Sequence, residues 1–254
     1  MKLLINEWRK FFRRKGISIP FPTLQLITTL AFFAIIRFSS KSHDWDINSF
    51  FETSMQISIS FLILLGILFA STTITREMSS GTIKFLLTRP YDRHKILMAK
   101  FASIAILMSA FTLVSIILNY IFVLIFFGQA PGMDVVFNKG GIAILTVLFE
   151  TVFFSSFALM ISTVINSSSM ATAISIVYYY VIPGIWTVIA MLLKIKIDSW
   201  GFRLSPFYSY KYLTDLTKFN SDFAITLAAN LVYICIFYLI ADTFFNKKDI
   251  SLSN

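Results

Sequence analysis

One carboxylate lies deep inside an apolar stretch of this 254-residue sequence. Glu150 is about nine residues into the run Gly141–Ile165, which is roughly 14 Å of helix. A charge near the middle of a bilayer costs ~2.5–3.5 kcal/mol on insertion scales, so Glu150 must face other helices or a water-filled cavity, or be protonated. It could meet a cationic group on a transported molecule. Alternatively, it could form a structural hydrogen bond with Thr146, Ser155 or Ser156.

Residue types that catalyse reactions or bind metals are otherwise sparse. Cys235 is the single cysteine, and the two histidines, His43 and His94, are far apart in sequence, so no disulfide, zinc site or iron–sulfur cluster is expected. Cys235 is expected to be a small buried hydrophobe. The sequence contains no phosphate-binding Gly-x-x-x-x-Gly-Lys-Ser/Thr loop and no His-Glu-x-x-His or Gly-x-Ser-x-Gly motif. We therefore expect a protein that is not an enzyme and has no cofactor of its own.

The composition predicts a membrane protein. Hydrophobic residues make up 57% of the chain and charged residues 14%, against about 45–50% and 25% in soluble domains. A bilayer core needs roughly 20 helical residues to cross it. Six runs meet that length: residues 17–38, 51–74, 96–127, 141–165, 170–193 and 223–245. The predicted fold is all-α, with residues 16–254 forming one transmembrane domain of six helices.

Two further features of these runs bear on packing. Pro183-Gly184 should kink or unwind the fifth run. Small residues, among them Ser58, Gly66 and Ser71, allow close helix packing or hydrogen bonds between helices.

The basic residues predict the orientation of the chain. Most of the 22 Lys and Arg residues lie in the N-terminal arm, the connection between the second and third runs, and the C-terminal tail. Cytoplasmic loops carry such an excess, so both termini are expected in the cytoplasm. The net charge is +9. Because the basic residues are clustered in this way, we expect them to contact a lipid membrane and not nucleic acid. Near the end of the sixth run, Asp242 is expected to pair locally with Lys247 or Lys248.

The first fifteen residues predict an amphipathic helix lying in the cytoplasmic interface. Apolar side chains recur at helical spacing with cations between them; the residues expected to contact the interface are Trp8, Arg9, Phe11 and Phe12. Such a helix places its apolar face at the acyl boundary and its cations near anionic headgroups. The alternative is a basic anchor that only sets the topology.

The cytoplasmic connection 76–95 holds a second short helix. Ser80 or Thr82 can cap its start and Pro90 ends it, while Asp92 can cap the helix that follows. An isolated helix of about two turns is marginal in water, so this one should gain order by docking against a partner. The alternative is a solvated loop whose cations only set the topology.

The extracellular connection 194–222 is too polar to span the membrane and too rich in aromatic residues to be a free linker. We expect a short helix or re-entrant piece there, at the outer interface where Trp and Tyr side chains are enriched.

Three motifs of the cytoplasmic connection resemble the first cytoplasmic loop of ABC-2 type permeases. They are Glu-x-x-x-Gly-Thr at Glu77–Thr82, Leu-Leu-Thr-x-Pro at Leu86–Pro90, and Arg93 followed by Ile96 and Lys100. The six-span layout, the N-terminal interfacial helix and the aromatic outer loop are similar to that family along nearly the whole chain. The sequence is most similar to small permeases of low-GC Gram-positive bacteria, and the resemblance extends to permeases of exporters for phenol-soluble modulins, which are short amphipathic peptides.

The resemblance implies a coupling helix that seats in a cleft of a separate ATP-binding subunit. It also implies a dimer of permeases, with the same chain or a paralogue as the second copy, in the bacterial cell membrane. Two ATP-binding subunits would bind the ATP and Mg²⁺. Buried contacts are expected from the apolar residues and rim contacts from the cations; Glu77 could instead cap locally or pair with Arg76 or Lys84. The expected contact residues are Glu77, Thr82, Ile83, Lys84, Phe85, Leu86, Leu87, Arg89, Tyr91 and Arg93.

The function that follows is ATP-driven export of an amphipathic peptide or lipid-like substrate. One alternative is a sensor or immunity protein that recognises a membrane-active peptide without pumping it. Another is an ion-coupled secondary transporter with Glu150 as the proton carrier, which the lack of an inverted internal repeat weakens.

Overall fold

A computed structural model describes residues 47–79, 92–129, 140–165, 167–195, 199–215 and 221–247, with four further helical residues between 27 and 34. All eight elements in these ranges are helices and the described residues contain no strand, which confirms the all-α prediction. The predicted interfacial helix 1–15, most of the first predicted span 17–38 and the predicted coupling helix lie outside the described residues.

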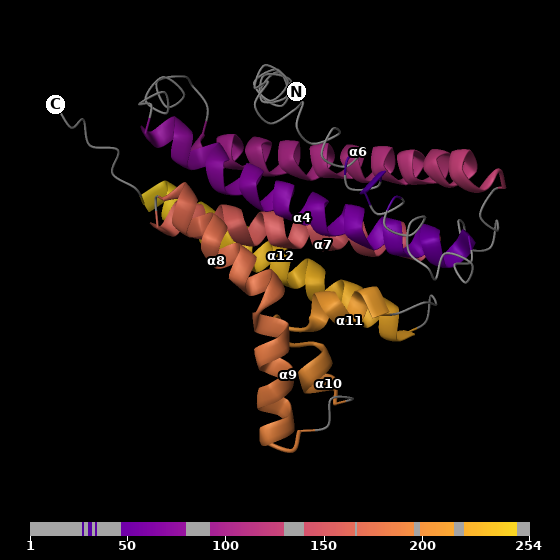
Figure 1. Cartoon of the computed structure of the whole chain (residues 1–254). Coiled ribbons are helices and arrows are strands. Elements are labelled where there is room, and N and C mark those ends of the chain that lie inside the picture. Colours follow the sequence, from indigo (N-terminus) through magenta and orange to yellow (C-terminus); the bar gives the residue numbers. More distant parts are fainter. Residues whose placement is uncertain are drawn as a thin grey trace.

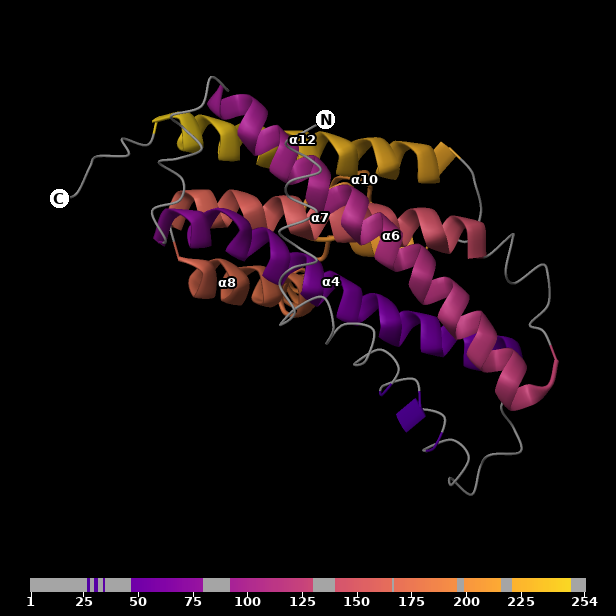
Figure 2. The same cartoon turned by 90° about the horizontal axis from the view of Figure 1, so that it is seen from above.

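Four long helices form the bundle: α4 (Ile47–Ser79), α6 (Arg93–Phe127), α7 (Gly140–Ile165) and α12 (Ser221–Lys247). They run roughly side by side. The helix α8 (Ser168–Tyr180) packs beside α4 and α7, and α9 (Ile182–Leu192) leads away from the bundle (Figures 1 and 2). Two short helices, α10 (Trp200–Arg203) and α11 (Ser209–Asp215), lie in the segment predicted to hold a short helix or re-entrant piece.

The described part contains five of the six predicted spans at most. The helices α4, α6, α7 and α12 are each long and apolar enough to cross a membrane, and α8 with α9 would make a fifth span bent by 46°. The chain is therefore a multi-pass membrane protein by the length and composition of its helices. With 35 residues, α6 is about 50 Å long at ~1.5 Å per residue, which exceeds a bilayer core of about 30 Å.

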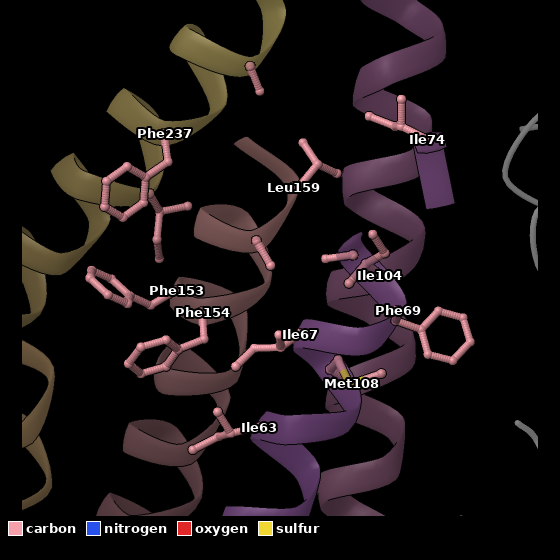
Figure 3. Packing of buried hydrophobic residues seen from close by; sticks show 14 of the residues in the cluster. Ile63, Ile67, Phe69, Ile74, Ile104, Met108, Phe153, Phe154, Leu159 and Phe237 are labelled. Carbon is pink, nitrogen blue, oxygen red and sulfur yellow. The ribbon is translucent and has the colours of Figure 1, made fainter. Parts of the chain in front are cut away.

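The largest core cluster lies where α4 and α7 pack against each other and against α6 and α12. Ile63 and Ile67 of α4 face Phe153 and Phe154 of α7, and Phe237 of α12 packs against the ring of Phe153 (Figure 3). Ile104 and Met108 extend the cluster onto α6. In a membrane, helices are held together by such close packing and by hydrogen bonds between helices.

Small and hydroxyl side chains join the helices at three places. A Cβ on Gly66 would lie 2.7 Å from Oγ of Ser155, so α4 and α7 approach closely there. Ser71 and Thr172 hydroxyls lie 2.7 Å apart between α4 and α8, and Asn119 donates to Oγ of Ser58 at 3.0 Å between α6 and α4. The expectation that Ser58, Gly66 and Ser71 support close packing or hydrogen bonding between helices is confirmed.

The fifth span breaks where proline predicts it. The break is at Val181, between α8 and α9, with Pro183 in the first turn of α9. Proline has no N–H, so the carbonyl of Tyr179, four residues earlier, loses its usual helical donor. The expected kink is confirmed.

Candidate functional site

One end of the bundle, which we call the loop end, gathers the helix termini that flank segment 80–91. There α4 ends at Ser79, α6 begins at Arg93 and α12 ends at Lys247, and the three termini lie at the same end in both views (Figures 1 and 2). The backbone of Glu77 belongs to the last turn of α4, and Arg93 is the first residue of α6. The other predicted contact residues, from Thr82 to Tyr91, lie outside the described residues, as do Trp8, Arg9, Phe11 and Phe12.

Asp92 stands at the start of α6 but does not cap it with its side chain. It occupies the N-cap position without a side-chain cap hydrogen bond. Its Oδ2 atom instead lies 2.7 Å from Nζ of Lys95. The hydrogen bond and charge of Lys95 lower the pKa of the Asp92 carboxyl. The expected capping role of Asp92 is wrong because the carboxylate turns to the nearby ammonium group.

The first turn of α6 contacts the last two turns of α12, and we call this contact the α6–α12 seam. Arg93 donates from Nη1 to the backbone carbonyl of Asn246 at 3.0 Å, and Nδ1 of His94 lies 3.0 Å from Oδ1 of Asp242. One turn further along α12, the ring of Tyr238 meets that of His94 edge-on at 5.9 Å. Figure 2 shows α6 crossing α12 here and diverging from it toward the other end of the bundle.

The contact of Asp242 differs from the local pair with Lys247 or Lys248 that the sequence suggested. Its partner is His94, in the first turn of another helix. The side chains at Tyr238, Asp242 and Asn246 are four residues apart, so they share the face of α12 that meets α6. The spacing of residues within α12 could not reveal that the partner of Asp242 comes from another helix.

Glu150 is buried in α7, with 7% of its surface exposed. Burial raises the pKa of the Tyr210 phenol, and the nearby Tyr178 phenol and Glu150 carboxylate act in the same direction. Ser155 donates to the carbonyl of Thr151 and Ser156 to that of Phe153, so neither hydroxyl donates to Glu150. The inward placement agrees with the expectation that this carboxylate faces other helices, and it brings Glu150 close to an aromatic cluster.

Tyr210 of α11 replaces the helical donor that Pro183 lacks. Its hydroxyl donates to the carbonyl of Tyr179 at 3.3 Å and to that of Tyr178 at 3.4 Å. Freed carbonyls in a membrane helix are satisfied in this way by neighbouring side chains. Sequence analysis did not single out Tyr210, because only the aromatic content of 194–222 and the proline at position 183 hinted at a connection.

The rest of segment 199–215 is fixed to the bundle by three more hydrogen bonds. Tyr178 donates to the carbonyl of Pro206 at 2.5 Å and Tyr233 to that of Leu204 at 2.7 Å. Ser209 donates to Oδ1 of the buried Asn230 at 3.1 Å. The segment that carries Tyr210 is therefore bonded to both α8 and α12.

Among the described residues, no group of three or more His, Cys, Asp or Glu side chains could hold a metal ion. Cys235 is exposed, so the expectation that it is buried is wrong. Cys235 lies on the surface of a membrane helix, where its side chain can face lipid. Lipid is as apolar as a protein interior, so this position suits a small hydrophobic side chain.

Comparison with known proteins places this arrangement in a family. The sequence model described as "ABC-2 family transporter protein" matches residues 1–250. The chain belongs to the ABC-2 family of transporter proteins. This ABC-2 family protein is therefore a membrane subunit of an ABC transporter, and the family implies a partner that binds ATP.

Two proteins of Bacillus subtilis (strain 168) are similar to this ABC-2 family protein. "Uncharacterized protein YhcI" is 28% identical over 214 residues, which cover 76% of this chain and 67% of that protein. "Uncharacterized membrane protein YdbK" is 30% identical over 198 residues, which cover 76% of this chain and 77% of that protein.

Proposed function

We propose that this chain is the permease subunit of an ATP-driven exporter. It would dimerise with a second copy or a paralogue and couple to two ATP-binding subunits. The observation that carries the proposal is the family match over residues 1–250, which includes the basic segment between α4 and α6. The chain has no phosphate-binding loop of its own, so the energy would come from ATP and Mg²⁺ in the partner.

The coupling element in this proposal is the helix predicted within segment 80–91. Its Leu86 and Leu87 would fill a pocket of the partner, while Lys84 and Arg89 would supply contacts at the rim. The place of segment 80–91 between α4 and α6 supports this role, because a short helix held between two long helices can pass its movement to both. Closure of the partner on ATP would then shift the bundle between two packings.

The proposed cargo is an amphipathic peptide or a lipid-like molecule. Glu150 would lie on its path, where a buried carboxylate beside the hydroxyl of Tyr210 offers a polar point in apolar surroundings. A cationic group on the cargo is the natural complement of that carboxylate. The cytoplasmic position of both termini and of the loop end belongs to the same proposal.

Replacing Leu86 and Leu87 with Asp tests the coupling helix. We expect the amount of ATP-binding subunit that co-purifies to fall at least tenfold, because a buried hot spot is worth about 2 kcal/mol or more. Membrane insertion should not change. Gly201→Asp is the matched control, since Gly201 lies in α10 and a Cβ there meets nothing within 4 Å. An unchanged complex with the double Asp variant would contradict the assignment.

A further inference from the structure

The α6–α12 seam contains two polar contacts made by consecutive residues. Arg93 and His94 directly follow the segment that holds the proposed coupling helix, and they reach Asn246 and Asp242, which are one turn apart on α12. Both polar contacts therefore join the start of α6 to the last turns of α12. No such pair is formed by Asp92 and Lys95, because their contact stays within the first turn of α6.

The two contacts differ in kind, and both favour a fixed position of α12. The carbonyl of Asn246 is one of the last four of its helix, which have no donor within the helix. Arg93 supplies a donor and a positive charge at the negative end of the α12 dipole. The side chain of Asp242 is 17% exposed and that of His94 50%. Water therefore screens their contact less than it screens the neighbouring pair of Asp92 and Lys95, whose side chains are 72% and 67% exposed.

The contact between α6 and α12 is confined to the loop end of the bundle. The ring of Tyr238 contacts both His94, at 5.9 Å, and Phe101, at 5.5 Å. The contact between α6 and α12 therefore continues from the polar residues through aromatic rings, over about two turns of α6. Beyond it α6 diverges from α12 (Figure 2), so a displacement of the α6 start meets α12 only near the loop end.

We infer that the α6–α12 seam transmits movement of the coupling segment to α12, with His94 and Arg93 as positioning residues. This inference rests on the proposed function, since it assumes that an ATP-binding subunit moves segment 80–91. When that subunit moves the start of α6, the two contacts carry the end of α12 with it. The ATP-binding subunit thus moves α6 directly, and the seam passes that movement on to α12.

The test follows α12 directly and needs no knowledge of the cargo. In a Cys235→Ser background, a fluorescent label on Ala224→Cys, an exposed position near the start of α12, reports its movement in the complex with the co-purified ATP-binding subunit. ATP and Mg²⁺ should change the fluorescence of the otherwise unaltered complex. His94→Ala should make that change at least about threefold smaller, as expected for a contact worth ~0.7 kcal/mol or more, while the basal ATP hydrolysis of the subunit remains.

Two matched variants separate transmission from a general structural role. Lys95→Ala removes the neighbouring ion pair that stays within α6, and it should leave the change in fluorescence as it was. His94→Asp should abolish the change because it opposes two carboxylates, and adding Asp242→His to it should restore the change by exchanging the partners. If His94→Ala does not insert into the membrane, Asp242→Asn is read by the same criteria.

Several results would overturn the inference. They are a full fluorescence change in His94→Ala, an equal loss in Lys95→Ala, no rescue by the exchanged pair, or no response of α12 to ATP in the unaltered complex. Failure of any ATP-binding subunit to co-purify is distinguishable from these, because it would refute the proposed function itself and the inference with it.

Discussion

Glu150 and Tyr210 show how single residues can serve both structure and transport. Glu150 is buried in α7, and its charge acts on the phenol of Tyr210, which belongs to α11. Tyr210 in turn supplies the donor that Pro183 cannot. Because burial raises the pKa of Tyr210, its phenol keeps its proton and can donate at any physiological pH.

Tyr210→Phe should destabilise the bundle modestly. It leaves the carbonyl of Tyr179 without this donor at a break in the helix, and such losses cost about 0.5–1.5 kcal/mol. The free energy of unfolding in mixed micelles measures the effect. Tyr180→Phe is the matched control, because the side chain of Tyr180 is 54% exposed and its loss should change little. Equal effects of the two substitutions would argue against the bridging role.

Glu150→Gln separates the charge of this residue from its size. If the carboxylate lies on the path of a cationic cargo, uptake of a labelled Lys- and Leu-rich amphipathic peptide into inside-out vesicles should fall about tenfold, which corresponds to ~1.4 kcal/mol. Assembly with the ATP-binding subunit should be unchanged. Glu52→Gln, at an exposed carboxylate of α4, should transport normally. Normal uptake by Glu150→Gln would favour a structural role for the residue.

At the scale of elements, the close approach of α4 to α7 limits how large a side chain can be accommodated between them. Gly66 allows the two helices to meet because a Cβ there would lie 2.7 Å from Oγ of Ser155 and 3.3 Å from Sδ of Met108. The hydroxyl of Ser155 already donates to Thr151 at 2.7 Å. It can move away only by giving up that bond.

Gly66→Ala should therefore cost about 1–3 kcal/mol of stability, as overpacking of a tight core does. Adding Ser155→Gly should recover much of the loss, because it removes the obstructing oxygen. Gly184→Ala is the control: a Cβ there meets nothing within 4 Å, and in a helix Ala is favoured over Gly by about 1 kcal/mol. Thermal unfolding in detergent compares the three. Full tolerance of Gly66→Ala would show that the helices can separate at little cost.

Much of the element pattern could be predicted from the sequence because it depends on local properties. Apolar runs of sufficient length predicted the long helices, and Pro183 predicted the break in the fifth span. Contacts across the bundle were harder. Asp242 was assigned a local lysine, but the structure places Nδ1 of His94, from another helix, 3.0 Å from its Oδ1 atom. Of the hydroxyl neighbours named for Glu150, Ser155 and Ser156 donate to backbone carbonyls of their own helix. Such contacts depend on which helix faces pack together, and the local sequence of one helix does not specify its neighbours.

At the scale of the whole molecule, the two ends of the bundle differ in character. The loop end carries the polar contacts of Arg93 with the Asn246 carbonyl and of His94 with Asp242. The segment with α10 and α11 contains rings and the pair of Arg203 with Asp222 at 3.9 Å. Guanidinium and aromatic ring also stack there, with Arg203 4.7 Å from the centre of the Tyr212 ring. Aromatic rings beside cations are typical of a membrane interface.

The proposed topology predicts opposite accessibility for these two ends. In a Cys235→Ser background, a membrane-impermeant maleimide added to intact cells should label Gly201→Cys in α10 but not Asp92→Cys at the loop end. Opening the cells should expose Asp92→Cys, whose native side chain is 72% exposed. Labelling of Asp92→Cys in intact cells would reverse the orientation and would place the coupling segment on the wrong side for an ATP-binding partner.

The break between α8 and α9 has a consequence for how the chain is made. With 13 and 11 residues, neither half reaches the roughly 20 residues that a bilayer crossing requires. The insertion machinery must therefore accept the two halves together, while the tyrosine that later covers the open carbonyls is still inside the ribosome. The fifth crossing becomes complete only when α11 has emerged and folded back onto α8. A segment made later thus stabilises a crossing that was made earlier.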